Sequence, residues 1–296
     1  MLANLSGMTH WTAADLPSFT GRTVIVTGAN SGLGEVTARE LARVGARVIL
    51  AVRNTAKGDA AAAGMTGDVE VRRLDLQSLA SVRAFAEGID AADVLINNAG
   101  IMAVPYAETA DGFESQIGTN HLGHFALTNL LLPKLTDRVV TVSSLMHLFG
   151  RVKVDDLDYR ARPYFAWPAY CQSKLANLLF TTELQRRLEA AGSALIAVAA
   201  HPGYSATNLQ GQTGNKFGTP IWRAGNKLLA TDAAFGARQT LFAASQPVAG
   251  DSFIGPRFLS NGPTQPVGRS PLARNRKTAA ALWSLSEQLT DVQFPL

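Results

Sequence analysis

Short runs of apolar, mostly β-branched residues alternate with longer helical segments along the first 200 residues of the chain. Six of these runs predict buried strands, at residues 23–27, 47–52, 69–74, 93–97, 138–142 and 195–200. Continuous Val, Ile and Leu strands separated by helices are typical of a parallel sheet that is covered on both faces. Because crossovers between parallel strands are right-handed, the topology narrows to a doubly wound sheet. We expect an α/β fold with about seven parallel strands and helices on both faces, formed as a single domain over residues 1–296.

The residue pattern of the chain changes after His201. Residues 204–227 carry four glycines and little periodicity, which predicts a long loop, and long irregular segments in compact domains are usually binding loops or lids. We therefore expect a substrate-binding loop region at about residues 204–230 and an N-terminal extension at about residues 1–19. Helical patterns at 232–244 and 279–289 and a last strand at 252–259 complete the predicted elements.

Composition excludes several classes of protein. The 27 Lys and Arg residues are scattered rather than gathered into a patch, so nucleic-acid binding is not expected. The single cysteine, Cys171, allows neither a disulfide framework nor a cysteine metal site, and the spacing of four of the histidines (121, 124, 147 and 201) matches no metal-ligand pair. Residues 1–19 lack the pattern of a signal peptide, and no apolar run is long enough to span a bilayer. A cytoplasmic protein without a metal site is expected.

A glycine-rich turn, TGANSGLG, follows the first predicted strand and opens the first helix. Gly28 permits the tight turn, Gly32 lets a pyrophosphate approach the backbone, and Gly34 allows the helix to pack closely on the strand. The helix N-terminus offers N–H groups and a positive dipole end to phosphates. A glycine-rich turn without a ligand is the alternative, but the strand–turn–helix context favours a Rossmann-type nucleotide site. Its turn residues are Gly28, Asn30, Ser31, Gly32, Leu33 and Gly34.

This turn resembles the nucleotide turn of the short-chain dehydrogenase/reductase superfamily, and further motifs of that family follow in order over roughly residues 20–260. They are Asp75–Leu76, Asn97–Asn98–Ala99–Gly100, Asn120, Ser143–Ser144, Tyr170-x-x-x-Lys174, and Pro202–Gly203 with Thr207. The segments NHLGHF and YCQSKLAN are similar to those of the retinol-dehydrogenase-like branch and its bacterial relatives. That branch also carries an insertion like the one at residues 151–164, which makes the gap between Ser144 and Tyr170 unusually long.

The resemblance implies a catalytic set of Asn120, Ser144, Tyr170 and Lys174. Tyr170 and Lys174 are four residues apart in a predicted helix, so their side chains lie on one face. Tyr170 would be the general acid and base, with a free-tyrosine pKa of about 10 that a nearby cation can lower by roughly 1–3 units. Lys174 would lower that pKa and bind the nicotinamide ribose, Ser144 would hold the substrate oxygen, and Asn120 would link Lys174 to solvent through water. The alternative is a solvent-facing Tyr–Lys pair and a serine that only caps a helix.

The second predicted strand ends at Arg53, where many dinucleotide-binding proteins carry an acidic residue for the ribose hydroxyls. A guanidinium suits a 2′-phosphate, so we expect NADP(H) rather than NAD(H), with an ordinary surface arginine as the alternative. The family pattern places Asp75 and Leu76 at the adenine. It places other residues at the adenosine ribose and the nicotinamide, where Tyr170 and Lys174 also bind: Asn98, Ala99, Gly100, Pro202, Ser205 and Thr207.

These residues predict an NADP(H)-dependent oxidoreductase that interconverts a carbonyl and an alcohol on a small hydrophobic molecule. Reduction of an activated C=C bond and a non-catalytic NADP(H)-sensing protein are the alternatives. Four aromatic residues are candidates for the substrate pocket or, equally, for core packing: Trp167, Tyr204, Phe217 and Trp222. Members of the family are often homodimers or homotetramers built partly on the Tyr–Lys helix, and the residues do not decide the oligomeric state.

Overall fold

A single sheet of eight strands organises the protein in the computed structural model, which describes residues 11–203, 233–259 and 261–296. The strands are β1 (Thr23–Thr27), β2 (Arg47–Val52), β3 (Val69–Arg73), β4 (Ala92–Asn97), β5 (Leu135–Val142), β6 (Ile196–Ala200), β7 (Phe253–Phe258) and β8 (Asn261–Pro266). Their order is β3-β2-β1-β4-β5-β6-β7-β8. Strands β1 to β7 pair in parallel, whereas β8 pairs antiparallel with β7. The predicted doubly wound sheet is confirmed, with one more strand than expected.

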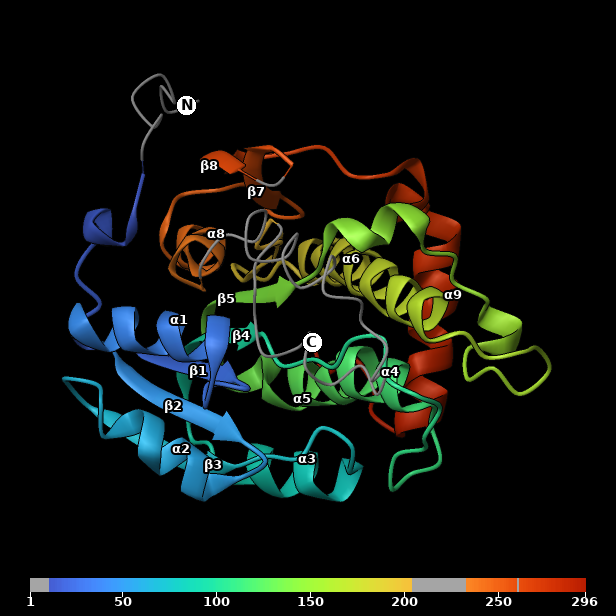
Figure 1. The fold of residues 1–296 in the computed structure, drawn as a ribbon, viewed down its shortest axis with the longest axis horizontal. Helices are drawn as coiled ribbons and strands as arrows, with labels where there is room; N and C mark the ends of the chain where they lie inside the picture. The colour runs from blue at the N-terminus through green and yellow to red at the C-terminus, as the bar shows by residue number, and fades with distance from the viewer. Residues whose placement is uncertain (1–10, 204–232, 260) are drawn as a thin grey trace, which may run out of the picture.

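Helices cover both faces of this sheet (Figure 1). One face carries α1 (Gly32–Arg43), α2 (Thr55–Ala62) and α8 (Ala233–Ser245). The other carries α3 (Leu79–Glu87), α5 (Gly123–Leu131), α6 (Ala166–Ala190) and α9 (Arg276–Thr290). Shorter elements are α4 (Ser115–Ile117), the π-helical turn η3 (Gly118–Leu122), and the 3-10 turns η2 (Ala13–Asp15), η4 (Leu132–Lys134), η5 (Leu145–Phe149), η6 (Val154–Asp156) and η8 (Pro271–Arg274).

The two cores follow from the alternation of side chains along each strand. In β1, Val24 and Val26 point to the α1 and α8 side, whereas Ile25 points to the α3, α5 and α6 side. The core on the α3, α5 and α6 side is completed by α9, where the Trp283 ring stacks on Phe180 with centroids 5.7 Å apart. Such aromatic contacts add to the burial of the rings, so α9 is a firmly packed part of this layer.

The expected N-terminal extension contributes to the first core from Trp11 onward. Trp11 and Phe19 are buried, and the Trp11 ring meets Phe242 of α8 edge-on at 5.2 Å. This part of the segment is therefore integral to the fold. Among the described residues, none of the helices combines the length and the apolarity needed to cross a membrane.

The order of the strands fixes where a ligand can bind. From β1 the chain adds β2 and β3 toward one edge of the sheet, and from β4 onward it adds strands toward the other edge. The direction therefore changes between β1 and β4, which are hydrogen-bonded neighbours although they are not consecutive. Ligands of open α/β sheets bind at the carboxyl ends of the strands at such a point. The glycine turn after β1 and Asn98 after β4 both lie at this edge.

Candidate active site

The turn between β1 and α1 has the shape that its glycines predict. Gly28 has φ +68°, and a Cβ atom there would come within 3.0 Å of the Ala99 Cα. At Gly34 a Cβ would overlap the Asn98 side chain and lie 2.5 Å from the Gly28 carbonyl oxygen. A left-handed conformation and close backbone contact both favour glycine, so the turn admits almost no side chain at these two positions.

The start of α1 fits a dinucleotide pyrophosphate. Ser31, the residue before the helix, is extended and makes no capping hydrogen bond through its side chain. The first N–H groups of a helix have no partner within the helix and carry the positive end of its dipole. These amides, next to the glycine backbone, are suitable donors for phosphate oxygens.

The segment after β4 is held against this turn by Thr27. The amides of Asn98 and Ala99 both donate to the Thr27 hydroxyl at 2.9 Å, and the Asn98 side chain donates to the Thr27 carbonyl at 2.8 Å. Asn97 donates to Thr128 of α5 at 2.9 Å. The asparagines therefore satisfy turn and helix groups, as the structural alternative expects. This role is compatible with the expected place of Asn98, Ala99 and Gly100 beside the ribose.

The Tyr–Lys pair lies in the first half of α6 and is buried. The exposed fractions of Tyr170 and Lys174 are 6% and 5%, so the solvent-facing alternative is wrong. The Lys174 ammonium lies 5.7 Å from the centre of the Tyr170 ring and donates to the Val142 carbonyl at 3.2 Å. Ser144, which follows β5, hydrogen-bonds to Tyr170 through its side chain. The structure thus brings Ser144, Tyr170 and Lys174 together.

The two neighbouring serines have different surroundings. The Ser143 hydroxyl is buried and donates to the Lys174 carbonyl at 2.7 Å, which fixes α6 to the end of β5. The Ser144 hydroxyl is partly exposed and accepts the Met146 amide at 3.2 Å, so it also caps η5. This arrangement supports Ser144 as the residue that meets a substrate oxygen.

Burial dominates the electrostatics of the pair. It raises the pKa of Tyr170 to about 12, and the hydrogen bond from Ser144 offsets only part of this increase. Burial also lowers the pKa of Lys174 to about 8. The pKa of Tyr170 therefore moves in the direction opposite to the one expected, because desolvation penalises the buried phenolate. The phenol stays protonated at neutral pH and can act as an acid.

Asn120 lies in the π-helical turn η3 and is fully buried. Its Oδ1 accepts the Ile101 amide at 2.8 Å, and its Nδ2 donates to the Ile101 carbonyl and to the Ser173 hydroxyl, both at 2.9 Å. These bonds use both side-chain protons. The side chain therefore ties the segment after β4 to α6, and a link to Lys174 would fall to the main-chain carbonyl.

The remaining predicted cofactor residues that the structure describes lie along the same edge. Arg53 is exposed directly after β2, and Asp75 accepts the Gln77 amide at 3.0 Å. Leu76 is buried against Gly123, where a Cβ would overlap the Leu76 carbonyl. Pro202 follows β6. Several predicted residues lie outside the described part of the chain: Ser205, Thr207, Tyr204, Phe217 and Trp222.

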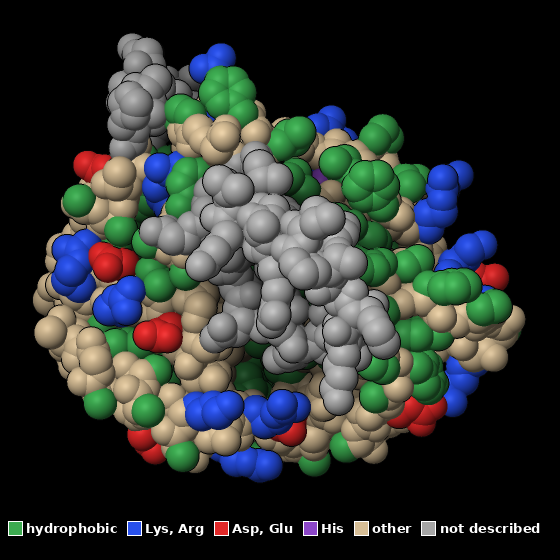
Figure 2. Space-filling model, viewed as in Figure 1, with side chains coloured by type: hydrophobic (Ala, Val, Ile, Leu, Met, Phe, Trp, Pro, Cys, Tyr) green, Lys and Arg blue, Asp and Glu red, His purple; other side chains and the backbone are tan. Residues whose placement is uncertain are grey.

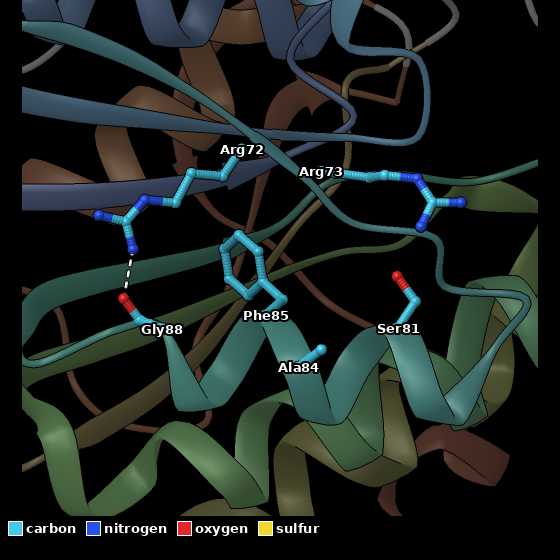
Figure 3. A pocket seen from close by; sticks show the side chains of 6 residues that line it. All are labelled: Arg72, Arg73, Ser81, Ala84, Phe85 and Gly88. Carbon is cyan, nitrogen blue, oxygen red and sulfur yellow. Dashed lines mark hydrogen bonds between the residues drawn. The ribbon is translucent and has the colours of Figure 1, made fainter.

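Arg73 is a functional candidate that the sequence reasoning missed. It lies beside Val52 in the register of β2 and β3, so it is next to Arg53 at the carboxyl edge. Figure 3 shows the shallow pocket beneath it, between the end of β3 and α3, where Arg72 reaches back to the Gly88 carbonyl while Arg73 extends the other way above Ser81. Neither Arg53 nor Arg73 forms an ion pair with any described residue. The signal available in the sequence was the pair of adjacent arginines, Arg72 and Arg73, at the end of the third predicted strand.

Within the described ranges, no group of three or more His, Cys, Asp or Glu side chains could hold a metal ion. Three of the histidines that the sequence analysis considered are buried with low pKa values: about 3 for His121, about 4 for His124 and about 3 for His201. Desolvation is the main cause in each case. These rings are neutral and structural in character.

Comparison with known proteins agrees with the motifs. The profile of the short chain dehydrogenase family matches residues 22–217. The chain belongs to this family. It is 42% identical to human retinol dehydrogenase 13 over 93% of this chain and 86% of that protein, which places it in the retinol-dehydrogenase-like branch and makes it an oxidoreductase.

Solved structures show the same fold. The crystal structure of an uncharacterized protein from Mycobacterium paratuberculosis has a TM-score of 0.88 and 69% identity, covering 97% of this chain and 100% of that chain. A complex of Pseudomonas aeruginosa RhlG with NADP has a TM-score of 0.63 at 22% identity, covering 80% of this chain and 95% of that chain. The latter likeness concerns the fold alone.

Proposed function

We propose that this dehydrogenase is NADP(H)-dependent and interconverts a carbonyl and an alcohol on a small hydrophobic molecule. The observation that supports this most is the meeting of Ser144, Tyr170 and Lys174 at the sheet edge that also carries the glycine turn. When bound, the reduced nicotinamide supplies a hydride to the carbonyl carbon.

The side chains of the chain supply the proton. Ser144 orients the substrate oxygen by hydrogen bonding, and Tyr170 donates its phenolic proton to that oxygen as the hydride arrives at carbon. In the reverse direction the Tyr170 phenolate accepts the alcohol proton. Lys174, held by the Val142 carbonyl, supplies positive charge that stabilises this phenolate, and Asn120 fixes the neighbouring turn of α6 through Ser173.

The preference for NADP(H) rests on Arg53 and Arg73. Arg73 pairs with Val52 in the β2–β3 register, so Arg53 and Arg73 lie at neighbouring strand ends and their side chains can reach one anion at this edge. A 2′-phosphate offers oxygens to both arginines, and each planar guanidinium can donate two parallel hydrogen bonds to phosphate oxygens. We expect single Ala substitutions at either arginine to weaken NADPH binding about tenfold and to leave NADH binding within twofold.

The matched control is Arg72→Ala on the same strand. Arg72 donates to Glu70 at 2.5 Å and to Gly88, so its guanidinium is already occupied. Fluorescence titrations with NADPH and NADH should therefore separate the three variants. Equal losses for both cofactors in the Arg53 and Arg73 variants would assign these arginines a structural role.

The hydrophobic character of the substrate is inferred from the rim of the site. Figure 2 shows hydrophobic side chains gathered near η5 and the start of α6. Leu148 and Phe149 follow Ser144 closely, and Phe165 and Trp167 precede Tyr170; all four are exposed, by 47% to 74%. Exposed apolar side chains grouped in this way usually mark a binding surface. The relationship to retinol dehydrogenases is consistent with a lipophilic aldehyde or alcohol, and residues 204–230 remain the proposed substrate loop.

Two other functions make different predictions in the same assay. An enzyme for activated C=C bonds would oxidise NADPH with enones but not with saturated aldehydes such as decanal. A non-catalytic sensor would bind NADPH and turn over nothing. The buried Ser144–Tyr170–Lys174 set favours carbonyl chemistry over the sensor, because a sensor does not need groups for proton transfer.

Self-association through α6 is also open to test. The face of α6 that carries Phe180 is covered by α9 of the same chain. We therefore propose that a homodimer or homotetramer would use another surface, or the outer side of α9. Light scattering of the wild type and of an Arg276→Glu, Lys277→Glu variant at the start of α9 would detect an interface there.

A further inference from the structure

His124 occupies the point where the glycine turn, the segment after β4 and the Asn120 turn meet. It is fully buried at the start of α5, which puts it on the helix that follows η3. Its Nε2 lies 2.9 Å from the Thr27 hydroxyl, and its Nδ1 lies 3.1 Å from the Asn120 carbonyl oxygen. One imidazole thus contacts the glycine turn, through Thr27, and the predicted catalytic set, through Asn120.

The hydrogen-bond inventory defines which ring nitrogen carries the proton. The Thr27 oxygen already accepts two amides, from Asn98 and Ala99, so both of its lone pairs are used. Its own proton must be donated, and His124 Nε2 at 2.9 Å is a better acceptor than the Ile96 carbonyl at 3.4 Å. Nε2 is then an acceptor and the proton is on Nδ1, which donates to Asn120.

The low pKa of His124 agrees with a neutral ring. A protonated imidazole would present two N–H groups to a site that offers one acceptor and one donor. The neutral Nδ1–H form satisfies both neighbours, and buried polar groups are normally satisfied in this way.

We propose that His124 is a positioning residue that couples the seating of the dinucleotide turn to the geometry of the proton-transfer set. Its Nε2 side steadies Thr27, which holds Asn98 and Ala99 against Gly28. Its Nδ1 side steadies the Asn120 carbonyl, and the Asn120 side chain in turn holds Ser173, the neighbour of Lys174. The catalytic part of this inference rests on the proposed function, whereas the cofactor part does not.

His121 provides a matched control within the same segment. It is also a fully buried, neutral imidazole, but its Nε2 lies 2.9 Å from the Ser286 hydroxyl of α9, away from the glycine turn. Ser286 also donates to the Leu282 carbonyl at 2.7 Å, so it keeps a partner when His121 is replaced. Substituting Phe at either position removes a buried ring donor and acceptor at a similar cost to packing.

The test compares His124→Phe with His121→Phe by thermal unfolding, NADPH titration and steady-state reduction of an aldehyde that the wild type accepts. We expect similar losses of Tm in both variants. We expect His124→Phe alone to lower kcat about tenfold and to raise the NADPH dissociation constant several-fold, which is the usual scale for losing a buried hydrogen bond. Equal kcat and NADPH affinity in the two Phe variants would overturn the proposal.

Two conservative variants separate the two sides of the ring and remain informative if His124→Phe does not fold. An Asn amide reaches the position of Nδ1, so His124→Asn should recover kcat more than cofactor affinity. A Gln amide reaches the position of Nε2, so His124→Gln should recover cofactor affinity more than kcat. Wild-type values of both properties in both variants would contradict the coupling role. If the wild type reduces no carbonyl, the proposed function fails, and the NADPH titrations still decide the Thr27 side of the inference.

Discussion

Mild acid should strongly destabilise this protein, because three of its buried histidines resist protonation in the folded state. The pKa values of His121, His124 and His201 lie at about 3, 4 and 3, whereas an unfolded histidine has a pKa near 6.5. Between these limits the unfolded chain binds protons that the folded chain does not. The contribution of the three neutral rings to the free energy of unfolding, which is complete at pH 7, is therefore lost as the pH falls below about 6.5.

The size of the loss follows from the shifts. One proton difference is worth about 1.4 kcal/mol per pH unit, so each ring costs about 2 kcal/mol between pH 6.5 and 5 and the three together cost about 6 kcal/mol. This sum is comparable with the whole stability of a typical domain, about 5–15 kcal/mol. Desolvation raises the pKa values of buried Glu114 and half-buried Asp158, and these two groups oppose the loss at the lower end of the range.

The assay is urea unfolding at pH 7, 6 and 5, followed by the fluorescence of the buried tryptophans Trp11 and Trp283. His121→Gln isolates one ring, because Gln cannot titrate but still offers an N–H to Ser286. Its free energy of unfolding should fall less steeply with pH than that of the wild type, by about 1.4 kcal/mol per pH unit below pH 6. Equal slopes for the two proteins would refute the reasoning, as would a wild-type stability that does not change between pH 7 and 5.

Three further changes test other parts of the structure. Gly34→Ala should weaken NADPH binding at least about tenfold in a fluorescence titration, because the new Cβ overlaps the Asn98 side chain; unchanged affinity would show that the turn can open without loss. Carbonyl reduction should decline as the pH rises through about 8, where Lys174 loses its charge, and Lys174→Arg should move that decline upward or remove it in a pH–rate profile; an unmoved decline would assign it to another group. Trp283→Ala should lower the free energy of unfolding by about 3–5 kcal/mol through loss of the contact with Phe180, with NADPH affinity intact; a loss of affinity of similar size would show that α9 also shapes the cofactor site.

The parallel strands and the glycine turn could be predicted because their signals are local. A β-branched run such as 23–27 matches β1 residue for residue, and Gly28 and Gly34 are required by contacts within a few residues of the turn or across to β4. Strand β8 was missed because its sequence, NGPTQP, lacks apolar β-branched residues; its pairing with β7 determines it instead.

Properties that depend on burial or on residues distant in the sequence could not be predicted from the sequence alone. The i, i+4 spacing of Tyr170 and Lys174 gives their common face but not their depth, and depth decides the direction of both pKa shifts. His124 acquires its surroundings only when β1 and α5 come together, and nothing adjacent in the sequence indicates that contact. The adjacent Arg72–Arg73 pair is visible in the sequence, but only the pairing of β2 with β3 shows that Arg73 lies beside Arg53.

The central claim is that Tyr170 transfers the proton in an NADP(H)-dependent carbonyl reduction, and one paired measurement tests it most directly. NADPH affinity and the rate of NADPH oxidation are measured for the wild type and Tyr170→Phe with retinal, decanal, a steroid ketone and a quinone. The account predicts similar NADPH affinity in both proteins, turnover of at least one carbonyl by the wild type, and a rate at least about a hundredfold lower in the variant. Turnover of the same carbonyl by Tyr170→Phe at the wild-type rate would contradict it.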